Sequence, residues 1–223
     1  MPSEYRICPV NTEISAVLWD FGGVILSSPF EAFNNYESLA GLPKDLIRTI
    51  NATNADTNAW AQLERAEVNH RQFCALFEAE ALQVGHVVDA DKVMHMLHGT
   101  IRPEMVEALD RVKAAGYAIA LLTNNFVSMA TAIDPERDAA IRAILARFDA
   151  VVESSAVGVR KPDPAFYAKA CALLGVLPTA CVFLDDLGVN LKPAAAMGIR
   201  TIKVLNADQA LTDLETILGI VLR

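Results

Sequence analysis

The sequence is short of cysteine and of aromatic residues, and each shortage excludes a class of protein. The cysteines number 4 in 223 residues (Cys8, Cys74, Cys171 and Cys181), with neither a CxxC pair nor the spacing of a zinc motif. No disulfide framework is therefore indicated, and we expect reduced thiols in a cytoplasmic protein. Aromatic residues make up 7% and hydrophobic residues 53%, so the chain can bury a large and mainly aliphatic core.

Long apolar runs are also missing. The first fifteen residues lack the apolar stretch of a secretory signal. The longest stretch without charge, from Ala114 to Ile133, is interrupted by polar residues between Thr123 and Ser128. That pattern is typical of a buried strand and its loop and not of a membrane span, so we expect no membrane partner.

Positive charge is in the minority. The chain has 19 Lys and Arg against 27 Asp and Glu, which gives a net charge of −8 and a pI near 5.0. Such a chain repels phosphate backbones at long range, so we expect no nucleic-acid partner. A small anionic substrate is compatible with this charge if a metal ion or a helix N-terminus reverses the field locally. The composition indicates no particular oligomeric state.

From about residue 101 onward, short apolar runs alternate with segments of helical periodicity. Strands are predicted at 117–122, 150–152, 181–184 and 201–205. Helices are predicted at 102–116, 135–148, 163–175 and 190–197, with a last one that carries Leu211, Leu214 and Ile217. This alternation is typical of βαβ units, so the fold class is α/β with a doubly wound, Rossmann-like parallel sheet.

The N-terminal part has a different pattern. An apolar strand is predicted at 14–19, yet no further strand of this kind comes before Tyr117. Between them lie two apolar sets at helical spacing, one around Phe33 and one around Phe77. We therefore predict a helical cap at 29–98, inserted after the first strand of a core that comprises 1–28 and 99–223.

Polar residues follow the predicted strands. Asp20 follows the first, Thr123 the second, and Asp185 with Asp186 the fourth, while Lys161 lies in the loop after the third. Ligands of open parallel sheets bind outside the carboxyl ends of the strands, so these side chains are expected to converge. Crowded carboxylates repel one another unless a cation joins them, and hard oxygen ligands suit Mg²⁺.

Taken singly, each of these residues has an ordinary explanation. Asp20 at a strand end can be a turn former, Thr123 can close a local turn, and Lys161 can be a solvated charge. Asn190 is predicted to be the N-cap of its helix. Convergence at one edge is what favours a functional site over these separate explanations.

Four segments resemble, in order, the motifs of the haloacid dehalogenase superfamily of hydrolases. They are Val17–Val24 (VLWDFGGV), Leu121–Asn125 (LLTNN), Lys161–Pro164 (KPDP) and Leu184–Asn190 (LDDLGVN). The stretch from Phe183 to Lys203 is most similar to the N-terminal phosphatase domain of soluble epoxide hydrolase. The cap is similar to the family only around Glu64–Glu67, so the resemblance implies no particular substrate.

The resemblance implies a phosphatase that acts on a small phosphorylated metabolite. Asp20 would be the nucleophile and would form an aspartyl-phosphate intermediate. Thr123 and the backbone amide of Asn124 would hold the phosphoryl group, and Lys161 would neutralise charge on both reacting groups. Mg²⁺ would be bound by Asp20, the backbone carbonyl of Gly22 and Asp186, with Asp185 close by.

One position departs from the pattern of the family's phosphatases. They usually carry a second Asp two residues after the nucleophile as general acid and base, and Gly22 stands there. A positioned acid is typically worth 10²–10⁴-fold in rate. Either a cap residue or water replaces it, or the leaving group needs little protonation, or activity is weak.

Two alternatives remain open on the sequence. A 2-haloacid dehalogenase also lacks the second Asp, but it needs no metal and lacks the pair Asp185–Asp186. A silent binding protein that kept the fold is favoured only by Gly22. A metal site at His95 and His98 is not predicted, since no third ligand is evident.

Overall fold

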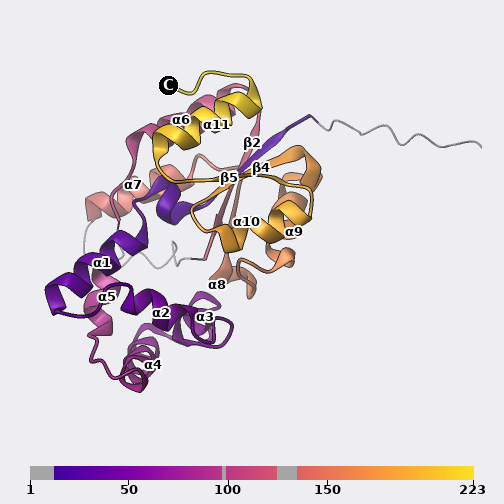
Figure 1. Cartoon of the computed structure of the whole chain (residues 1–223). Helices are drawn as coiled ribbons and strands as arrows, with labels where there is room; N and C mark the ends of the chain where they lie inside the picture. Colours follow the sequence, from indigo (N-terminus) through magenta and orange to yellow (C-terminus); the bar gives the residue numbers. More distant parts are fainter. Residues whose placement is uncertain (1–12, 97–98, 125–134) are drawn as a thin grey trace, which may run out of the picture.

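The structure is a computed structural model and describes residues 13–96, 99–124 and 135–223. Its centre is a parallel sheet of five strands in the order β3-β2-β1-β4-β5 (Figure 1). The strands are β1 (Ala16–Trp19), β2 (Ala118–Thr123), β3 (Ala150–Glu153), β4 (Cys181–Asp185) and β5 (Arg200–Lys203). The α/β class and the parallel sheet predicted from the sequence are confirmed.

Helices cover both faces of the sheet. One face packs against α6 (Pro103–Ala114), α7 (Pro135–Leu145) and α11 (Ala207–Leu218). The other packs against α9 (Pro164–Leu174) and α10 (Gly188–Ala196), with the short α8 (Ser154–Val157) after β3. Alternate residues of β1 enter the two cores, Val17 and Trp19 on one face and Ala16 and Leu18 on the other. All four are fully buried, which explains why the sequence of a strand covered on both faces is an unbroken apolar run.

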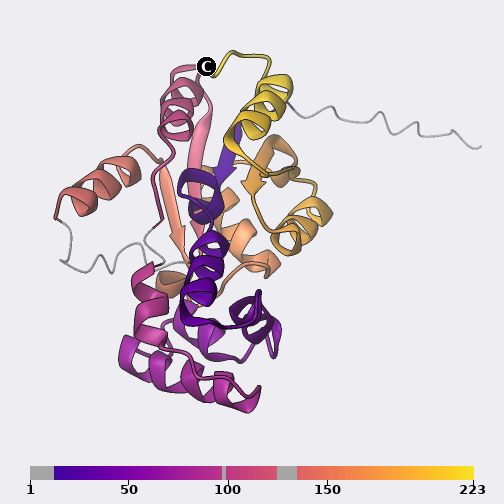
Figure 2. The same ribbon diagram turned by 60° about the vertical axis from the view of Figure 1, so that its left-hand side comes forward.

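A helical group is inserted between β1 and β2. It consists of α1 (Pro29–Ala40), α2 (Leu46–Ala52), α3 (Ala59–Glu64), α4 (His70–Gln83) and α5 (Ala90–Met96). These helices share a hydrophobic core of their own, in which Trp60 packs edge-on against Phe73 with ring centroids 4.9 Å apart. Figures 1 and 2 show the group beyond one end of the sheet, with α8 beside it. We refer to α1–α5 as the cap.

The two chain segments that join the cap to the sheet run side by side. Leu26 and Ile101 form an isolated antiparallel bridge, and Ser27 N donates to Thr100 O at 2.8 Å. Arg102 N donates to Ile25 O at 2.9 Å, just before α6 begins. The segment that enters the cap and the segment that leaves it are therefore paired with each other, and we refer to this pair as the crossing.

Several predicted boundaries shift by a few residues, and one predicted role is wrong. Asp163 caps α9 as expected, accepting from Ala165 N at 2.8 Å. Asn190, predicted as an N-cap, lies inside α10, which begins at Gly188. Among the described residues, no helix is long and apolar enough to span a membrane. Asn125 and His98 lie outside the described residues.

Candidate active site

The carboxyl ends of the strands bring three carboxylates together. Trp19 pairs with Leu184, so the next residues of these strands, Asp20 and Asp185, lie side by side at the sheet edge. Asp186 follows in the loop, and one carboxylate oxygen from each Asp lies within 4.8 Å of the others. Asp20 and Asp185 are buried and Asp186 is half-buried. The sequence placed these three residues at one edge, and the structure does so as well.

Lys161 joins two of these carboxylates. Its Nζ lies 2.7 Å from Asp20 Oδ1 and 2.8 Å from Asp185 Oδ2, and its side chain is 2% exposed. Burial alone would lower the pKa of the ammonium, but the adjacent Asp185 and Asp20 more than offset this and raise it. Lys161 is therefore a permanent buried cation and not the solvated surface charge that its sequence context alone suggested.

Asp20 lies in the most unfavourable electrostatic position of the group. Burial raises the pKa of its carboxyl well above the ordinary value; Lys161 offsets part of this, and Asp185 and Asp186 raise it further. Its Oδ1 accepts both from Lys161 Nζ and from Phe21 N, the latter at 2.7 Å. Both contacts use one oxygen, so the second oxygen, Oδ2, faces neither of these partners.

Asp185 is held on every side. Its Oδ1 accepts from Leu187 N at 2.7 Å, and Oδ2 accepts from Lys161. The amide of Asn190 donates to both oxygens, at 3.1 and 3.0 Å. Asn190 thus lies in the first turn of α10 and anchors a carboxylate, which corrects the N-cap prediction. Asp185 organises the strand end, the helix start and the lysine together.

Asp186 is held from the cap side and requires its glycine neighbour. Its Oδ2 accepts from Ser28 Oγ at 3.1 Å, and Ser28 is also the N-cap of α1. A Cβ on Gly23 would lie 2.2 Å from Asp186 Oδ2, and the φ of Gly23 is +76°. Arg102 Nη1 donates to Gly23 O at 2.8 Å and fixes this turn. Ser28 and Arg102 were missed in the sequence, although Ser28 before Pro29 carries an ordinary helix-start signal.

Thr123 and Asn124 stand at the end of β2. Thr123 is fully buried and pairs with Glu153. The side chain of Asn124 donates to Lys161 O at 3.0 Å and accepts from Lys161 N at 2.9 Å. These two hydrogen bonds fasten the backbone of Lys161 to the neighbouring strand end. Asn124 therefore positions the lysine, a contact that its sequence context did not predict.

A cap carboxyl group lies where the cap contacts the core at α8 and Arg160. Glu64 ends α3, and its carbonyl accepts from Ser154 Oγ of α8 at 2.5 Å. Arg160 Nε lies 2.9 Å from Glu64 Oε2, yet this buried oxygen accepts no hydrogen bond from any described residue. Burial raises the pKa of Glu64 to about 7, and Arg160, Lys161 and Arg65 offset only part of the effect. A carboxyl group that titrates near neutrality thus lies where cap and sheet meet.

The three carboxylates suit a hard divalent cation. Carboxylate oxygens are the ligands that Mg²⁺ prefers, and it is commonly held by one or two carboxylates plus water and substrate oxygens. Burial, and after it the neighbouring carboxylates, raise the pKa of Asp20, and a nearby positive charge offsets both effects. Asp185 is already saturated by Lys161, Leu187 and Asn190, so Asp20 and Asp186 are the better ligands.

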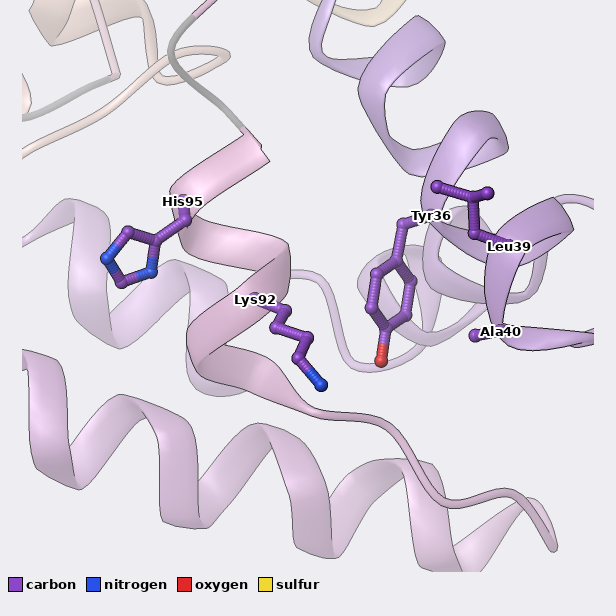
Figure 3. Close-up of a pocket in the computed structure, with 5 residues that line it drawn as sticks. All are labelled: Tyr36, Leu39, Ala40, Lys92 and His95. Atoms are coloured by element: carbon purple, nitrogen blue, oxygen red, sulfur yellow. The ribbon is translucent and has the colours of Figure 1, made fainter.

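A separate hollow lies on the cap. It measures about 380 Å³ and is lined by Tyr36, Leu39, Ala40, Lys92 and His95 of α1 and α5 (Figure 3). None of the carboxylates at the sheet edge lines it. We therefore assign the chemistry to the sheet edge and not to this hollow.

Similarities to known proteins extend over most of the chain. A family described as haloacid dehalogenase-like hydrolase matches residues 14–198. The chain is 32% identical over 211 residues to mouse Acyl-CoA dehydrogenase family member 10, and 28% over 216 to mouse Bifunctional epoxide hydrolase 2. It is matched over 92% and 90% of its own length but spans only 19% and 38% of theirs.

Two further similarities cover whole proteins. Phosphatase MT3486 of Mycobacterium tuberculosis is 28% identical over 204 residues, which are 88% of this chain and 89% of that protein. The structure of a HAD family enzyme from Bacteroides thetaiotaomicron, in complex with magnesium and inorganic phosphate, superimposes with a TM-score of 0.59. At 19% identity, covering 90% of this chain and 98% of the other, it shows a shared fold.

Proposed function

The chain belongs to the haloacid dehalogenase-like hydrolases, and from this premise we propose that it is a Mg²⁺-dependent phosphatase acting on monoesters of small phosphorylated metabolites. One observation carries the proposal: Asp20, Asp185 and Asp186 meet at one sheet edge around the buried ammonium of Lys161. The similarity to Phosphatase MT3486 along nearly its full length supports the same activity. So does the solved relative that binds magnesium and phosphate.

In this proposal Asp20 is the nucleophile. Its Oδ1 is occupied by Lys161 and Phe21, which leaves Oδ2 to attack phosphorus. The new bond joins Oδ2 to phosphorus while the bond from phosphorus to the ester oxygen breaks. Water then attacks the aspartyl phosphate, releases inorganic phosphate and restores the carboxylate. The two contacts on Oδ1 hold the carboxylate in one orientation through both steps.

The surrounding residues orient the phosphoryl group and neutralise its charge. Lys161 stays charged and shares Asp20, so it offsets negative charge as the two anions approach. Asn124 and Asp185 hold this lysine at its backbone and its ammonium. Thr123 and the amide of Asn124 stand at the adjacent strand end, where they would bind the phosphoryl oxygens.

Asp20, Asp186 and the backbone carbonyl of Gly22 would hold Mg²⁺. Bound there, the ion supplies electrostatic stabilisation of the phosphoryl charge, which is the main demand of phosphoryl transfer. Ser28 and Gly23 serve this role indirectly, since one fixes Asp186 and the other leaves room for it.

The leaving oxygen needs a proton that Gly22 cannot give, and we assign this task to Glu64. Its pKa of about 7 suits a general acid at neutral pH. Its ion pair with Arg160, the chain neighbour of Lys161, supports this role. Glu64→Gln is therefore expected to slow the hydrolysis of alkyl phosphates by about 10²–10⁴-fold and that of aryl phosphates far less. Glu67→Gln, which changes an exposed neighbour, is the matched control.

We treat residues 29–98 as a cap that closes over the substrate and 1–28 with 99–223 as the catalytic core. The cap has its own hydrophobic core and is joined to the sheet by the paired crossing at Leu26 and Ile101. A lid placed directly after the nucleophile can exclude water and select the ester. Substitutions on its inner side are expected to change substrate preference without changing Mg²⁺ binding.

The second candidate, a 2-haloacid dehalogenase, is favoured by Gly22 at the position of the second Asp. Phosphate release from an aryl phosphate and halide release from a 2-haloacid, each with Mg²⁺ and with chelator, distinguish the two. We expect phosphate release that chelator abolishes and no halide release. Halide release that persists in chelator would support the dehalogenase. The absence of both phosphate release and halide release would support a silent binding protein.

A further inference from the structure

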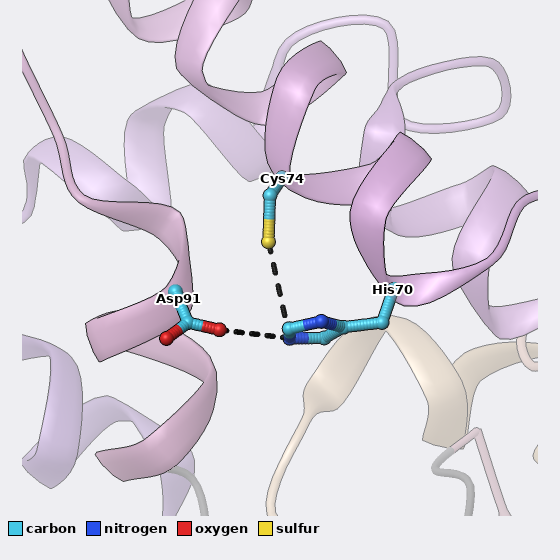
Figure 4. Close-up of side chains that lie close together, drawn as sticks. All are labelled: His70, Cys74 and Asp91. Carbon is cyan, nitrogen blue, oxygen red and sulfur yellow. Dashed lines mark hydrogen bonds and ion pairs between the residues drawn. The ribbon is translucent and has the colours of Figure 1, made fainter.

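A second group of metal-ligand side chains lies in the cap, away from the catalytic carboxylates. His70 and Cys74 stand one turn apart on α4, and Asp91 lies in the first turn of α5 (Figure 4). One ligand atom from each lies within 4.8 Å of the other two. His70 and Asp91 are about half exposed, so an ion in solvent can reach the group.

The separations are close to those of a zinc site. His70 Nε2 lies 3.8 Å from Cys74 Sγ and 3.4 Å from Asp91 Oδ1. In a tetrahedral site with zinc bonds of about 2.0–2.3 Å, neighbouring ligand atoms are about 3.3–3.6 Å apart. Small rotations of exposed side chains therefore bring the three atoms to ligand positions.

A catalytic relay does not explain the group. In a nucleophile–histidine–carboxylate relay the two partners contact different ring nitrogens. Here the sulfur and the carboxylate both approach the same atom, His70 Nε2, as Figure 4 shows. Three ligand atoms that converge on one point are what a cation requires.

We propose that His70, Cys74 and Asp91 bind a Zn²⁺ ion that ties α4 to α5. Sulfur with imidazole selects zinc, whereas the all-oxygen cluster at the sheet edge selects magnesium, so the two sites differ in metal preference. His95 supports the third ligand: its Nδ1 lies 2.7 Å from Asp91 O and 3.5 Å from Asp91 Oδ2. The fourth tetrahedral position is left to water.

The position of α5 gives this ion a structural consequence. α5 is the last helix of the cap and precedes the crossing at Ile101 and Arg102. A metal that joins the first turn of α5 to α4, the longest described cap helix, fixes these two helices against each other. The sequence showed no zinc spacing because the ligands come from two helices, as His-x₃-Cys on one and a single Asp on the other.

Cobalt binding tests the proposal, since Co²⁺ replaces Zn²⁺ and gives a near-ultraviolet charge-transfer band only when a thiolate ligates it. The protein is titrated with Co²⁺ in excess Mg²⁺, which fills the catalytic carboxylates. We expect the band in the unaltered chain and its displacement by Zn²⁺. Cys74→Ser should lose it. His70→Ala and Asp91→Asn should weaken binding by more than the 10–100-fold typical of losing a supporting residue. His86→Ala, which removes an imidazole outside the group, should leave the titration unchanged.

A thermal measurement gives an independent readout. Zn²⁺ at saturating Mg²⁺ should raise the Tm of the unaltered chain and of His86→Ala, but not of Cys74→Ser. Binding of Co²⁺ without a sulfur band, or a band that survives in Cys74→Ser, would overturn the proposal and leave a surface ion pair only. Equal Zn²⁺ shifts in all variants would overturn it as well. None of these outcomes bears on phosphatase activity.

Discussion

At the residue scale, two adjacent glycines follow the candidate nucleophile and their backbones differ. Gly22 has φ −71° and ψ 134°, which any residue adopts, whereas Gly23 has φ +76° and faces the Asp186 carboxylate. The backbone at Gly22 therefore accepts any side chain. Gly23 is required, because its φ is positive and a Cβ there would clash with Asp186.

This difference predicts opposite effects of two similar substitutions. Gly23→Ala should lower the free energy of unfolding by about 1–2 kcal/mol for the left-handed backbone and weaken Mg²⁺ binding by displacing Asp186. Gly22→Ala should change stability by less than about 1 kcal/mol. Chemical denaturation and Mg²⁺ titration measure both. Equal losses in the two variants would contradict this account of Gly23.

Asp20→Asn should abolish activity without unfolding the chain. The carboxyl of Asp20 is strained by burial and by two neighbouring carboxylates, so a neutral amide relieves repulsion while Lys161 keeps Asp185. We expect unchanged or slightly higher Tm and a loss of kcat on the order of 10⁴–10⁶-fold, as for other nucleophiles. A marked fall in Tm would show that the ion pair of Asp20 with Lys161 is mainly structural.

The sequence was sufficient to predict which residues gather at the edge, but not how they contact one another. Asp20, Thr123, Lys161 and Asp185 lie at or after strand ends, and parallel strands end at one edge whatever the details of packing. Asn190 was misassigned because Asn is a frequent N-cap. In the structure Asp185 accepts from Leu187 N, so α10 begins earlier and Asn190 turns back to Asp185. Such contacts depend on tertiary geometry that no local pattern encodes.

At the scale of elements, the strands and helices of the core were easier to predict than the cap. The central strands β1, β2 and β4 are buried on both faces, and the helices carry clear ends, such as Asp163 and Gly175 of α9. The cap has short helices, and its meeting with the sheet through Glu64 and Ser154 joins residues 90 positions apart. The sequence therefore located the cap but not the carboxyl group that it contributes.

The contact of α3 with the core predicts a pH dependence of stability. Folding raises the pKa of Glu64 from 4.5 to about 7, so the folded state binds this proton more tightly than the unfolded state. Its contribution is therefore fully present below pH 4.5 and is lost as the pH rises through 7. A shift of this size is worth about 3 kcal/mol.

Glu64→Gln tests this linkage. The amide carries no charge at any pH, so the variant should lose less stability than the unaltered chain between pH 5 and pH 8 (order of 1–3 kcal/mol by the same conversion). Denaturant titrations at several pH values provide the measurement, and Glu67→Gln serves as the control because its carboxyl is exposed. Parallel stability curves for Glu64→Gln and the unaltered chain would contradict the raised pKa.

At the scale of the whole molecule, a chain of net charge −8 gathers three carboxylates at one end of its sheet. One buried ammonium does not neutralise them, so a divalent cation should favour the folded state. We expect Mg²⁺ to raise the Tm, by an amount that grows with concentration, and Asp186→Ala to reduce this effect strongly. An undiminished Mg²⁺ shift in Asp186→Ala would place the cation elsewhere.

The central claim is phosphoryl transfer to Asp20, and acid-quenched single turnover with mass spectrometry tests it most directly. The chain is mixed with an aryl phosphate and Mg²⁺, quenched in acid during turnover and digested. We predict that the peptide containing Asp20 gains the mass of one phosphoryl group, and that it gains none in chelator or in Asp20→Asn. Phosphate release without that mass on Asp20, or with it on another residue, would contradict the account.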